Sequence, residues 1–562
     1  MATAPALAPP TAAPQASALR PRGAPRRRPT VVAVLVGLAV VAGLLARLPT
    51  GGPLWLDESL SVAIARLPLS QLPEALRHDG SPPLYYLLLH GWTSQLGTSD
   101  AAVRSLSLVC SALALPPAAA LGRRLAGPRG GVSALLLLSA SPFAIRYASE
   151  TRMYSLLLLE ALLGGLALAR ALERPTRGRL ALVTLAAGAL LYTHYWALFL
   201  LAALGLGVLW RARTDRTARR LVGALAGAVV LFVPQLPAFV YQSQHTGTPW
   251  APKTHPGLLV DVLLGYGGPG GSDEGTLVGV AFLALATLGV LAVREPGRLV
   301  LRPRASAVGW SLLALSVGAL VLALAADMVA GQGFVARYTV VALPAFVLLV
   351  ARGVGLLPRR WAVGVLAVAV LAGTAAGRWD AQHQRTSAGL VAATLAQTTA
   401  PGDVVLMCPD QLAPALHRAL ARAQVSRTQL VYGDDPLGPS RVDWVDYAQH
   451  NAALDPEQLA LRYDAAVGPG HRLAVVWEDG YRTFDDQCGR LVAQLSTLLG
   501  PPRQLLTRDT RDLEGGNVSV FDSGLVPRQE PVATGAERSR LGHDTASPQV
   551  AVGSLRPHLG EC

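Results

Sequence analysis

The sequence predicts a mainly α-helical protein that crosses a membrane many times and carries a small α/β domain near its C-terminus. Hydrophobic residues make up 51% of the 562 residues and charged residues only 15%, a balance typical of membrane proteins. About eleven apolar runs approach the length that crosses a bilayer. After residue 376 the pattern changes to short strands alternating with helices, which indicates an α/β domain.

The arginines predict the orientation of the helical domain, residues 31–376. The first span, residues 31–48, follows Arg26, Arg27 and Arg28, and further arginine clusters occupy every second loop. Basic loops mark the cytoplasmic side, so we expect a multi-pass cell-membrane protein with a cytoplasmic N-terminus and an extracytoplasmic C-terminal domain. Residues 1–30 are expected to be a disordered basic lead. The later spans are expected at residues 103–121, 132–145, 153–169, 180–191, 197–210, 221–240, 276–293, 310–325, 339–351 and 361–375.

Two long segments between the spans are expected at the outer face. The first outer loop, residues 50–100, contains two short helix patterns at 69–77 and 83–92, which we expect to lie along the membrane surface. The second, residues 241–275, is rich in Gly, Pro and His. Both belong to the face opposite the arginine clusters.

The C-terminal domain, residues 377–525, is expected to contain a partly parallel sheet. Strand patterns occur at 403–408, 429–433, 472–478 and 517–522, and helix patterns at 411–423 and 484–499. Cys408 and Cys488 both fall in this domain, so a single disulfide is open to them in an oxidising compartment. Residues 526–562 are expected to be a disordered polar tail.

The net charge of +13 does not indicate a nucleic-acid-binding protein. The arginines sit in short clusters between apolar runs and do not form one broad basic face. We interpret them as topology signals and expect membrane lipid, but no nucleic acid, as a partner.

Chemically varied side chains gather only at the predicted outer face. The cytoplasmic loops carry little besides arginine, whereas the outer segments carry carboxylates, arginines, histidines and tyrosines. A carboxylate at a membrane boundary costs free energy unless it has a partner or a function. The candidate site residues are Asp57, Glu58, His78, Asp79, Arg146, Tyr147, Glu150, Arg152, Tyr154, His194, Arg337 and Tyr338.

These residue types suit a reaction on a lipid-linked phosphate. Guanidinium groups match phosphate oxygens and stabilise the charge that develops as a phosphate leaves. A carboxylate can take the proton of an attacking hydroxyl, and tyrosines can stack against a sugar ring. Together they predict glycosyl transfer from a polyprenyl-phosphate sugar donor to a hydroxyl of a glycan, lipid or protein acceptor.

The order of the motifs adds a resemblance to a known fold family. The motifs are Asp57-Glu58 after the first span, Pro-Pro-Leu-Tyr-Tyr at 82–86, Ser-Pro at 141–142 before Arg146-Tyr147, Glu-Thr-Arg-Met-Tyr at 150–154, and Arg337-Tyr338 with Pro344. In this order they resemble the integral-membrane glycosyltransferases of the GT-C fold. The most similar group is the bacterial branch related to protein O-mannosyltransferases and lipid A aminoarabinose transferases (glycosyltransferase family 39-like), and the resemblance covers residues 48–357.

The resemblance implies roles for three parts of the chain. Asp57 maps to the catalytic base of the first outer loop, and Glu58 would assist it or bind the acceptor. The outer loop at 241–275 maps to a lid over the substrate. Ser81 departs from the pattern, because relatives often carry an acidic residue or a histidine before the Pro-Pro pair; here His78 and Asp79 come slightly earlier.

Each candidate also has a simpler interpretation. Asp57 could cap a helix, and His78 with Asp79 could form an ordinary turn. Interfacial arginines extend toward lipid headgroups, and tyrosines form aromatic belts, without any catalytic role. His194, which lies between two tyrosines in the sequence, could be a packed interface residue.

The resulting prediction is an inverting glycosyltransferase without a cofactor. Asp57 deprotonates the acceptor hydroxyl, and Arg152, Arg337 or both bind the departing phosphate. A divalent cation held by Asp57, Glu58 and Asp79 is the alternative source of positive charge. The alternative functions are a transporter or flippase of a lipid-linked phosphate, which should show interrupted helices with polar groups at the bilayer midplane, and a sensory outer domain anchored by the spans.

Overall fold

The computed structural model of the protein describes residues 31–49, 51–251, 253–268, 273–295, 298–302, 306–331, 333–433, 436–509 and 511–522. The predicted lead over residues 1–30 and the predicted tail over 526–562 lie outside the described residues.

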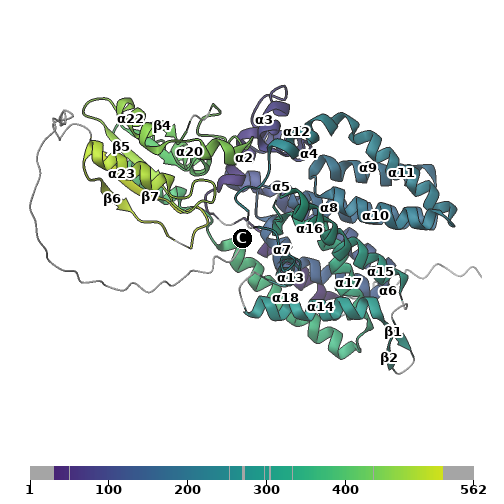
Figure 1. Ribbon diagram of the computed structural model, residues 1–562. Helices are drawn as coiled ribbons and strands as arrows, with labels where there is room; N and C mark the ends of the chain where they lie inside the picture. Colours follow the sequence, from purple (N-terminus) through teal and green to yellow (C-terminus); the bar gives the residue numbers. More distant parts are fainter. Residues whose placement is uncertain are drawn as a thin grey trace, which may run out of the picture.

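The protein consists of a helical bundle with an α/β domain at one end (Figure 1). Helices α2 (Leu56–Ala65), α3 (Leu72–Asp79) and α4 (Leu84–Leu96) come from the first outer loop, and α2 packs against the α/β domain. This architecture confirms the predicted fold class, a mainly helical protein with a small sheet region.

Each span predicted from the sequence overlaps a helix. Five helical stretches of the described chain are long and apolar enough to cross a membrane, namely Asp100–Ser139, Tyr154–Glu173, Arg216–His245, Ala307–Ala330 and Arg359–Gln382, and shorter apolar helices occupy most of the other predicted spans. The protein is therefore a multi-pass membrane protein. The bundle helices are α1 (Val31–Ala46), α5 (Asp100–Leu113), α6 (Leu115–Ser139), α8 (Tyr154–Glu173), α9 (Arg177–Thr193), α10 (Ala197–Ala212), α11 (Arg216–Phe232), α12 (Leu236–His245), α14 (Asp273–Leu291), α15 (Ala307–Leu313), α16 (Ala319–Ala330), α17 (Leu343–Leu356) and α18 (Arg359–Gln382).

The predicted span at 132–145 is wrong at its end. Helix α6 stops at Ser139, and α7 (Pro142–Ala148) begins after Ser141, whose hydroxyl accepts a hydrogen bond from the Ala144 amide. Pro142 lacks an amide hydrogen and so suits a helix start rather than a helix interior. Within α6, Gly127 has a φ of +72° and precedes Pro128, so the chain folds back there into two helical arms.

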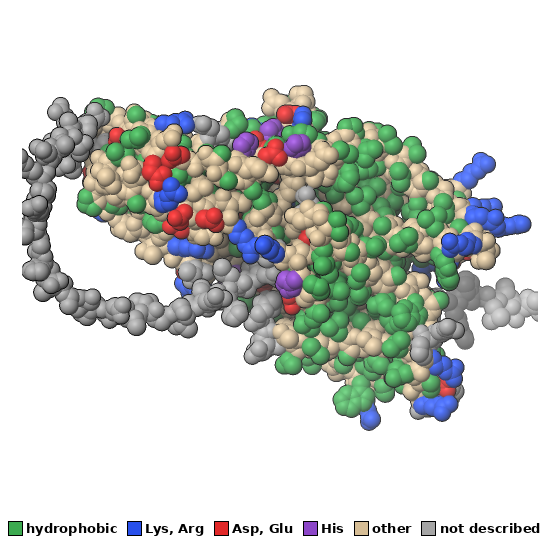
Figure 2. Space-filling view, in the orientation of Figure 1, with side chains coloured by type: hydrophobic (Ala, Val, Ile, Leu, Met, Phe, Trp, Pro, Cys, Tyr) green, Lys and Arg blue, Asp and Glu red, His purple; other side chains and the backbone are tan. Residues whose placement is uncertain are grey.

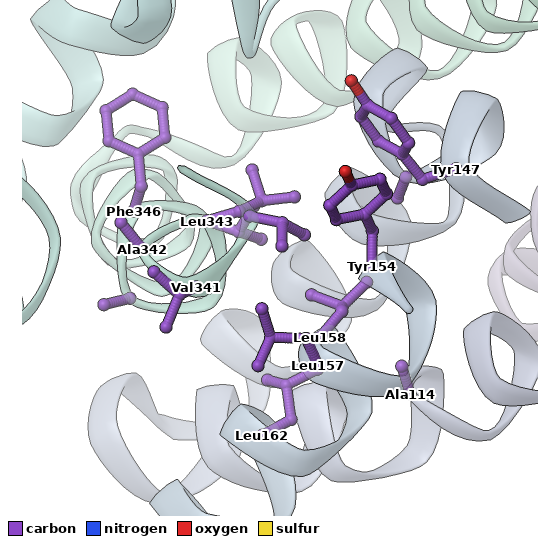
Figure 3. Close-up of a cluster of buried hydrophobic side chains, with 14 of the residues drawn as sticks. Ala114, Tyr147, Tyr154, Leu157, Leu158, Leu162, Val341, Ala342, Leu343 and Phe346 are labelled. Carbon is purple, nitrogen blue, oxygen red and sulfur yellow. The ribbon is translucent and has the colours of Figure 1, made fainter. Parts of the chain in front are cut away.

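Helix α17 is the most deeply buried element of the bundle. It packs between α6 and α14. A Cβ atom on Gly353 would lie 1.9 Å from the Leu285 carbonyl oxygen, so glycine is required for the close approach to α14. On another side, Leu343 points toward Tyr154 of α8 within one apolar cluster (Figure 3). The Phe346 ring points away from α8 and lies 5.3 Å from the ring of Tyr266.

A buried arginine joins three helices near one end of the bundle. Arg47, directly after α1, is fully buried and donates hydrogen bonds to the Ser111 hydroxyl (2.9 Å) and to the carbonyls of Leu138 (2.8 Å) and Gly43 (2.8 Å). The guanidinium thereby satisfies carbonyl groups at the end of α6 and joins α1, α5 and α6.

The surface of the bundle is divided along its length. Figure 2 shows apolar side chains covering its middle, and basic side chains projecting from the end far from the α/β domain. A short hairpin of β1 (Ala292–Glu295) and β2 (Arg298–Leu301) also lies at that far end, where the sequence predicted only the end of a span and a basic loop (Figure 1). The apolar band fits lipid contact.

The α/β domain contains a five-stranded mixed sheet in the order β4-β3-β5-β7-β6. Strands β3 (Val404–Cys408), β4 (Thr428–Val431) and β5 (Arg472–Trp477) are parallel, and β7 (Asn517–Asp522) and β6 (Arg503–Leu506) complete the sheet as antiparallel strands. Four of these strands match the predicted ones, whereas the short, half-exposed β6 was missed.

Helices cover both faces of this sheet. Val405 and Met407 of β3 pack with α19 (Ala388–Thr398) and α20 (Ala413–Arg422), while Leu406 packs with α22 (Pro456–Ala466) and α23 (Gln487–Leu499). Alternate residues of a strand point to opposite faces, so β3 needs apolar side chains at every position. A disulfide joins Cys408 to Cys488 and thereby fixes α23 to β3.

The disulfide yields a stability prediction. Cys408 and Cys488 are separated by 80 residues, so replacing both by serine should lower the free energy of unfolding of the α/β domain by about 2–4 kcal/mol. Pulse proteolysis in increasing urea measures this change. The control is Cys110→Ala, which removes the buried free cysteine and no bridge. An unchanged urea midpoint in the double variant would contradict the prediction.

Candidate functional site

A cavity of about 650 Å³ lies between the helical bundle and the α/β domain. Its walls come from α2, the end of α3, the segments before α8 and α10, the segment after α12, the 3-10 helix η3 (Ala336–Val341), and loops of the α/β domain. Of the twelve candidate site residues, it is lined by Asp57, Asp79, Arg152, His194, Arg337 and Tyr338. Segments that are distant in sequence therefore meet in one cavity.

Asp57 occupies the first turn of α2 and lies between two arginines. Its Oδ2 atom is 3.8 Å from Nε of Arg152 and 3.5 Å from Nη2 of Arg337. The side chain is buried, and Oδ2 has no hydrogen-bond partner among the described residues. Two guanidinium groups at these distances supply opposite charge to the buried carboxyl group, while Oδ2 keeps its capacity to accept a hydrogen bond from a hydroxyl donor.

The two arginines are held by different contacts. Arg152 donates a hydrogen bond to the Ser61 hydroxyl (3.1 Å), which lies one turn of α2 after Asp57. Arg337 lies over the rings of Trp250 (4.8 Å), Tyr338 (5.6 Å) and Trp55 (5.8 Å), as cation–π pairs do. The Nε atoms of both arginines are buried and make no hydrogen bond within the described chain. Both guanidinium groups therefore keep donors for an anionic ligand.

Aromatic rings form one wall of the cavity. The rings of His194 and Tyr338 are 4.9 Å apart, and both line it. Tyr154 lies behind them, 6.1 Å from His194 and 6.4 Å from Tyr338. Tyr147 lies 4.8 Å from Tyr154 in the apolar cluster of Figure 3. Tyr147 and Tyr154 thus support the wall and do not line the cavity.

Glu58 does not join Asp57 in the cavity, contrary to the sequence-based prediction. Its carboxylate receives hydrogen bonds from Nε (2.8 Å) and Nη2 (2.6 Å) of Arg104 on α5, and from the Thr151 amide (2.8 Å). Consecutive helix residues point about 100° apart, and Glu58 is turned toward Arg104 whereas Asp57 lines the cavity. Glu58 instead anchors α2 and the segment that carries Arg152.

Arg146 and Glu150 are also directed away from the cavity. Arg146 forms an ion pair with Asp380 (2.8 Å) near the end of α18, and Glu150 pairs with Arg385 just beyond it. These pairs fasten the region between α7 and α8 to the chain that leads into the α/β domain. The predicted substrate-binding role of Arg146 and Glu150 does not agree with this placement.

His78 and Asp79 have separate surroundings at the end of α3. Asp79 lines the cavity and accepts a hydrogen bond from the Tyr86 hydroxyl (2.7 Å). Nδ1 of His78 lies 2.8 Å from Asp443 of the α/β domain, so His78 connects the two parts of the protein and lies outside the cavity wall.

The α/β domain contributes residues that the sequence did not single out. They include Glu478, Tyr481, Arg482, Arg508 and Glu514, all of which line the cavity. For Glu478 the sequence offered one signal, its position directly after the buried strand β5. No motif marked the others, whose loops meet the bundle only in the folded chain.

Two carboxyl groups of this domain have raised pKa values. Burial raises the pKa of Glu478 to about 8, although Arg508 lies 2.5 Å from its Oε1 atom and lowers it. Burial also raises the pKa of Glu514 well above its usual range, against a hydrogen bond that Oε1 accepts from the Leu56 amide (2.8 Å). Glu514 therefore contacts the residue that precedes Asp57.

The structure places the residues of the predicted lid and of the alternative cation site differently. From the predicted lid, residues 241–275, the side chains of Gln242, Thr248 and Trp250 line the cavity. Among the residues that the structure describes, no group of three or more His, Cys, Asp or Glu side chains is arranged to hold a metal ion. The cation site built from Asp57, Glu58 and Asp79 fails because Glu58 faces Arg104.

Comparisons with known proteins identify the fold. A family model for dolichyl-phosphate-mannose-protein mannosyltransferases matches residues 80–240. The crystal structure of ArnT from Cupriavidus metallidurans bound to undecaprenyl phosphate is similar, with a TM-score of 0.54 and 16% identity over 87% of this chain and 97% of ArnT. ArnT in the apo state gives a TM-score of 0.56 and 15% identity with the same coverage. No match is found among curated protein sequences.

These findings confirm the resemblance drawn from the motifs. The chain has the GT-C fold, and its residues 80–240 are similar in sequence to the dolichyl-phosphate-mannose-protein mannosyltransferase family. At 15–16% identity the structural likeness establishes the fold alone.

The position of Glu58 yields a testable prediction. Glu58→Gln should destabilise the protein by about 3–5 kcal/mol, because it leaves the buried Arg104 without its countercharge. The yield and thermal midpoint of the detergent-solubilised protein measure this change. Glu74→Gln, at a side chain that is 68% exposed, is the matched control. If the Glu58 variant kept full stability, the structural role would be wrong.

The pKa of Glu478 yields a second prediction. A raised pKa means that the folded state holds the proton more tightly than the unfolded state. This contribution to stability is complete below pH 4.5 and is lost as the pH rises through about 8. The urea midpoint of the wild type, measured from pH 5 to pH 8, should therefore fall more steeply than that of Glu478→Gln. Glu457→Gln, at an exposed pair with Arg490, should keep the wild-type slope.

Proposed function

We propose that the protein is a membrane glycosyltransferase that moves a sugar from a polyprenyl-phosphate-linked donor to a hydroxyl acceptor, with inversion at the anomeric carbon. The observation that carries this proposal is the placement of Asp57 between Arg152 and Arg337 in a cavity of a GT-C fold. A base and two phosphate-binding groups are the parts that such a transfer needs.

The bonds change in one concerted displacement. Oδ2 of Asp57 accepts the proton of the acceptor hydroxyl, whose oxygen forms a bond to the anomeric carbon of the donor. The bond from that carbon to the phosphate oxygen breaks, and its electron pair leaves with the polyprenyl phosphate. The guanidinium groups of Arg152 and Arg337 bind the departing phosphate through donors such as their Nε groups, which make no hydrogen bond within the described chain.

The similar proteins support the class of donor. ArnT was crystallised with undecaprenyl phosphate, and the matching family model is named for dolichyl-phosphate-mannose-protein mannosyltransferases. Both names contain a polyprenyl phosphate, which suits a cavity that combines two arginines with apolar walls. A hexose or a pentose would be carried by such a donor, and arginines can neutralise a monophosphate without a metal ion or another cofactor.

We propose that the cavity opens at the extracytoplasmic face. The basic side chains project from the opposite end of the bundle, as the positive-inside rule requires of a cytoplasmic end (Figure 2). The disulfide of the α/β domain supports the same orientation, because disulfides persist in oxidising compartments.

The transporter alternative would use the same arginines without a base. It would leave the donor intact, whereas the proposed enzyme releases polyprenyl phosphate and a glycosylated product. Incubation with a panel of synthetic polyprenyl-phosphate sugars, followed by mass spectrometry of the products, distinguishes the two.

The role of Asp57 gives the decisive prediction. Asp57→Asn keeps the shape of the side chain and removes the base, so kcat should fall roughly 10²–10⁴-fold while the protein stays folded. The assay follows release of polyprenyl phosphate with an acceptor present. Asp261→Asn, at an exposed position of α13 (Leu258–Gly265), is the control. Transfer at the wild-type rate by the Asp57 variant would rule out the assignment.

A further inference from the structure

The topology of the α/β sheet creates a crevice that the transfer mechanism does not use. After β3 the chain passes through α20 to β4 on one side, and then returns through α21 (Tyr447–Ala452) and α22 to β5 on the other side of β3. The two connections lie on opposite faces of the sheet. In open α/β sheets, ligands bind at the carboxyl ends of the strands where the strand order reverses in this way.

This crevice opens into the cavity that holds Asp57. Gln411 follows β3, and Glu478 and Tyr481 follow β5; all three side chains line the cavity. The reversal point between β3 and β5 is therefore part of the cavity wall opposite the membrane helices.

Buried polar atoms at the crevice are unsatisfied within the described chain. Glu478 and Glu514 are each 3% exposed, and the Oε2 atom of each has no hydrogen-bond partner there. Nε2 of Gln411 and Nε of Arg508 are buried donors that also have no hydrogen-bond partner within the described chain. A buried polar group without a partner is costly, so acceptors and donors that line one cavity point to a ligand that supplies the missing bonds.

The chemistry of these groups describes the ligand. The crevice offers both hydrogen-bond acceptors and donors, since Glu478 pairs with Arg508 while Glu514, Arg482 and Gln411 line the same cavity. A neutral ligand with several hydroxyl groups fits, because a hydroxyl both donates and accepts hydrogen bonds. Tyr481 and Trp444 add aromatic surface for the apolar face of a sugar ring.

We propose that the crevice at the carboxyl ends of β3 and β5 is the acceptor subsite and that it binds a neutral carbohydrate, with Glu478, Glu514 and Gln411 bonding its hydroxyl groups. This inference rests on the proposed function and names the class of its acceptor. Oε1 of Glu514 accepts a hydrogen bond from the Leu56 amide. A sugar held by Glu514 therefore lies beside the residue that precedes Asp57.

Photo-crosslinking of the full-length protein tests the subsite directly. The probe is an octyl glucoside that carries a diazirine on the sugar, and a serine- and threonine-containing peptide with a benzophenone serves as the competing class. Peptide mapping by mass spectrometry should place the glucoside on residues 411, 478–482, 508, 513 and 514. Glu478→Gln should lower the crosslinking yield about tenfold, as expected for loss of one hydrogen bond to the sugar.

Control variants separate binding from folding and from catalysis. Tyr481→Leu removes the aromatic surface without changing charge and should also lower the yield, while Glu457→Gln should not. Asp57→Asn should keep the crosslink and lose transfer. Crosslinks outside these segments, an unaffected yield in Glu478→Gln, or crosslinking of the peptide alone would overturn the proposal.

The two proposals can fail separately. If the wild type transfers sugar but the glucoside does not label the crevice, the acceptor subsite is wrong and the transferase stands. If the glucoside labels the crevice but no donor is turned over, the carbohydrate site stands and the proposed reaction is wrong.

Discussion

The ion pairing of Asp57 with Arg152 and Arg337 is the constraint on which the rest of the site depends. A buried carboxylate costs several kcal/mol unless opposite charge compensates it, so three segments must be held together at one end of the bundle. Asp57 belongs to α2, Arg152 precedes α8 and Arg337 belongs to η3. The pairing is loose, at 3.5–3.8 Å, and leaves Oδ2 of Asp57 without a hydrogen bond among the described residues. It provides charge compensation while leaving the carboxylate oxygen open to a substrate.

A second set of ion pairs holds these segments in place. Arg104 pairs with Glu58 on α2, and Arg385 pairs with Glu150, close to Arg152. Glu58 and Glu150 belong to the same sequence motifs as Asp57 and Arg152, yet their side chains face into the protein. Acids and arginines of one motif thus divide into groups that contact the cavity and groups that position it, as in sites whose functional side chains are fixed by supporting contacts.

The α/β domain completes the cavity. Its loops contribute Glu478, Arg508 and Glu514, and Glu514 is bonded to the backbone of α2. A hydrogen bond therefore joins the α/β domain directly to the helix that carries Asp57.

The sequence by itself determined the spans, the strands with continuous apolar runs and the family resemblance, because run length, periodicity and motif order are local properties. It also predicted that Asp57, Arg152 and Arg337 would meet, since all three were assigned to one face of the membrane. Only the tertiary structure decided that Glu58, Arg146 and Glu150 face away and that Glu478 and Glu514 join the cavity. The direction of a side chain depends on its position around the helix and on its partners in the folded chain. Arg104 lies 46 residues from its partner Glu58, and Arg385 lies 235 residues from its partner Glu150.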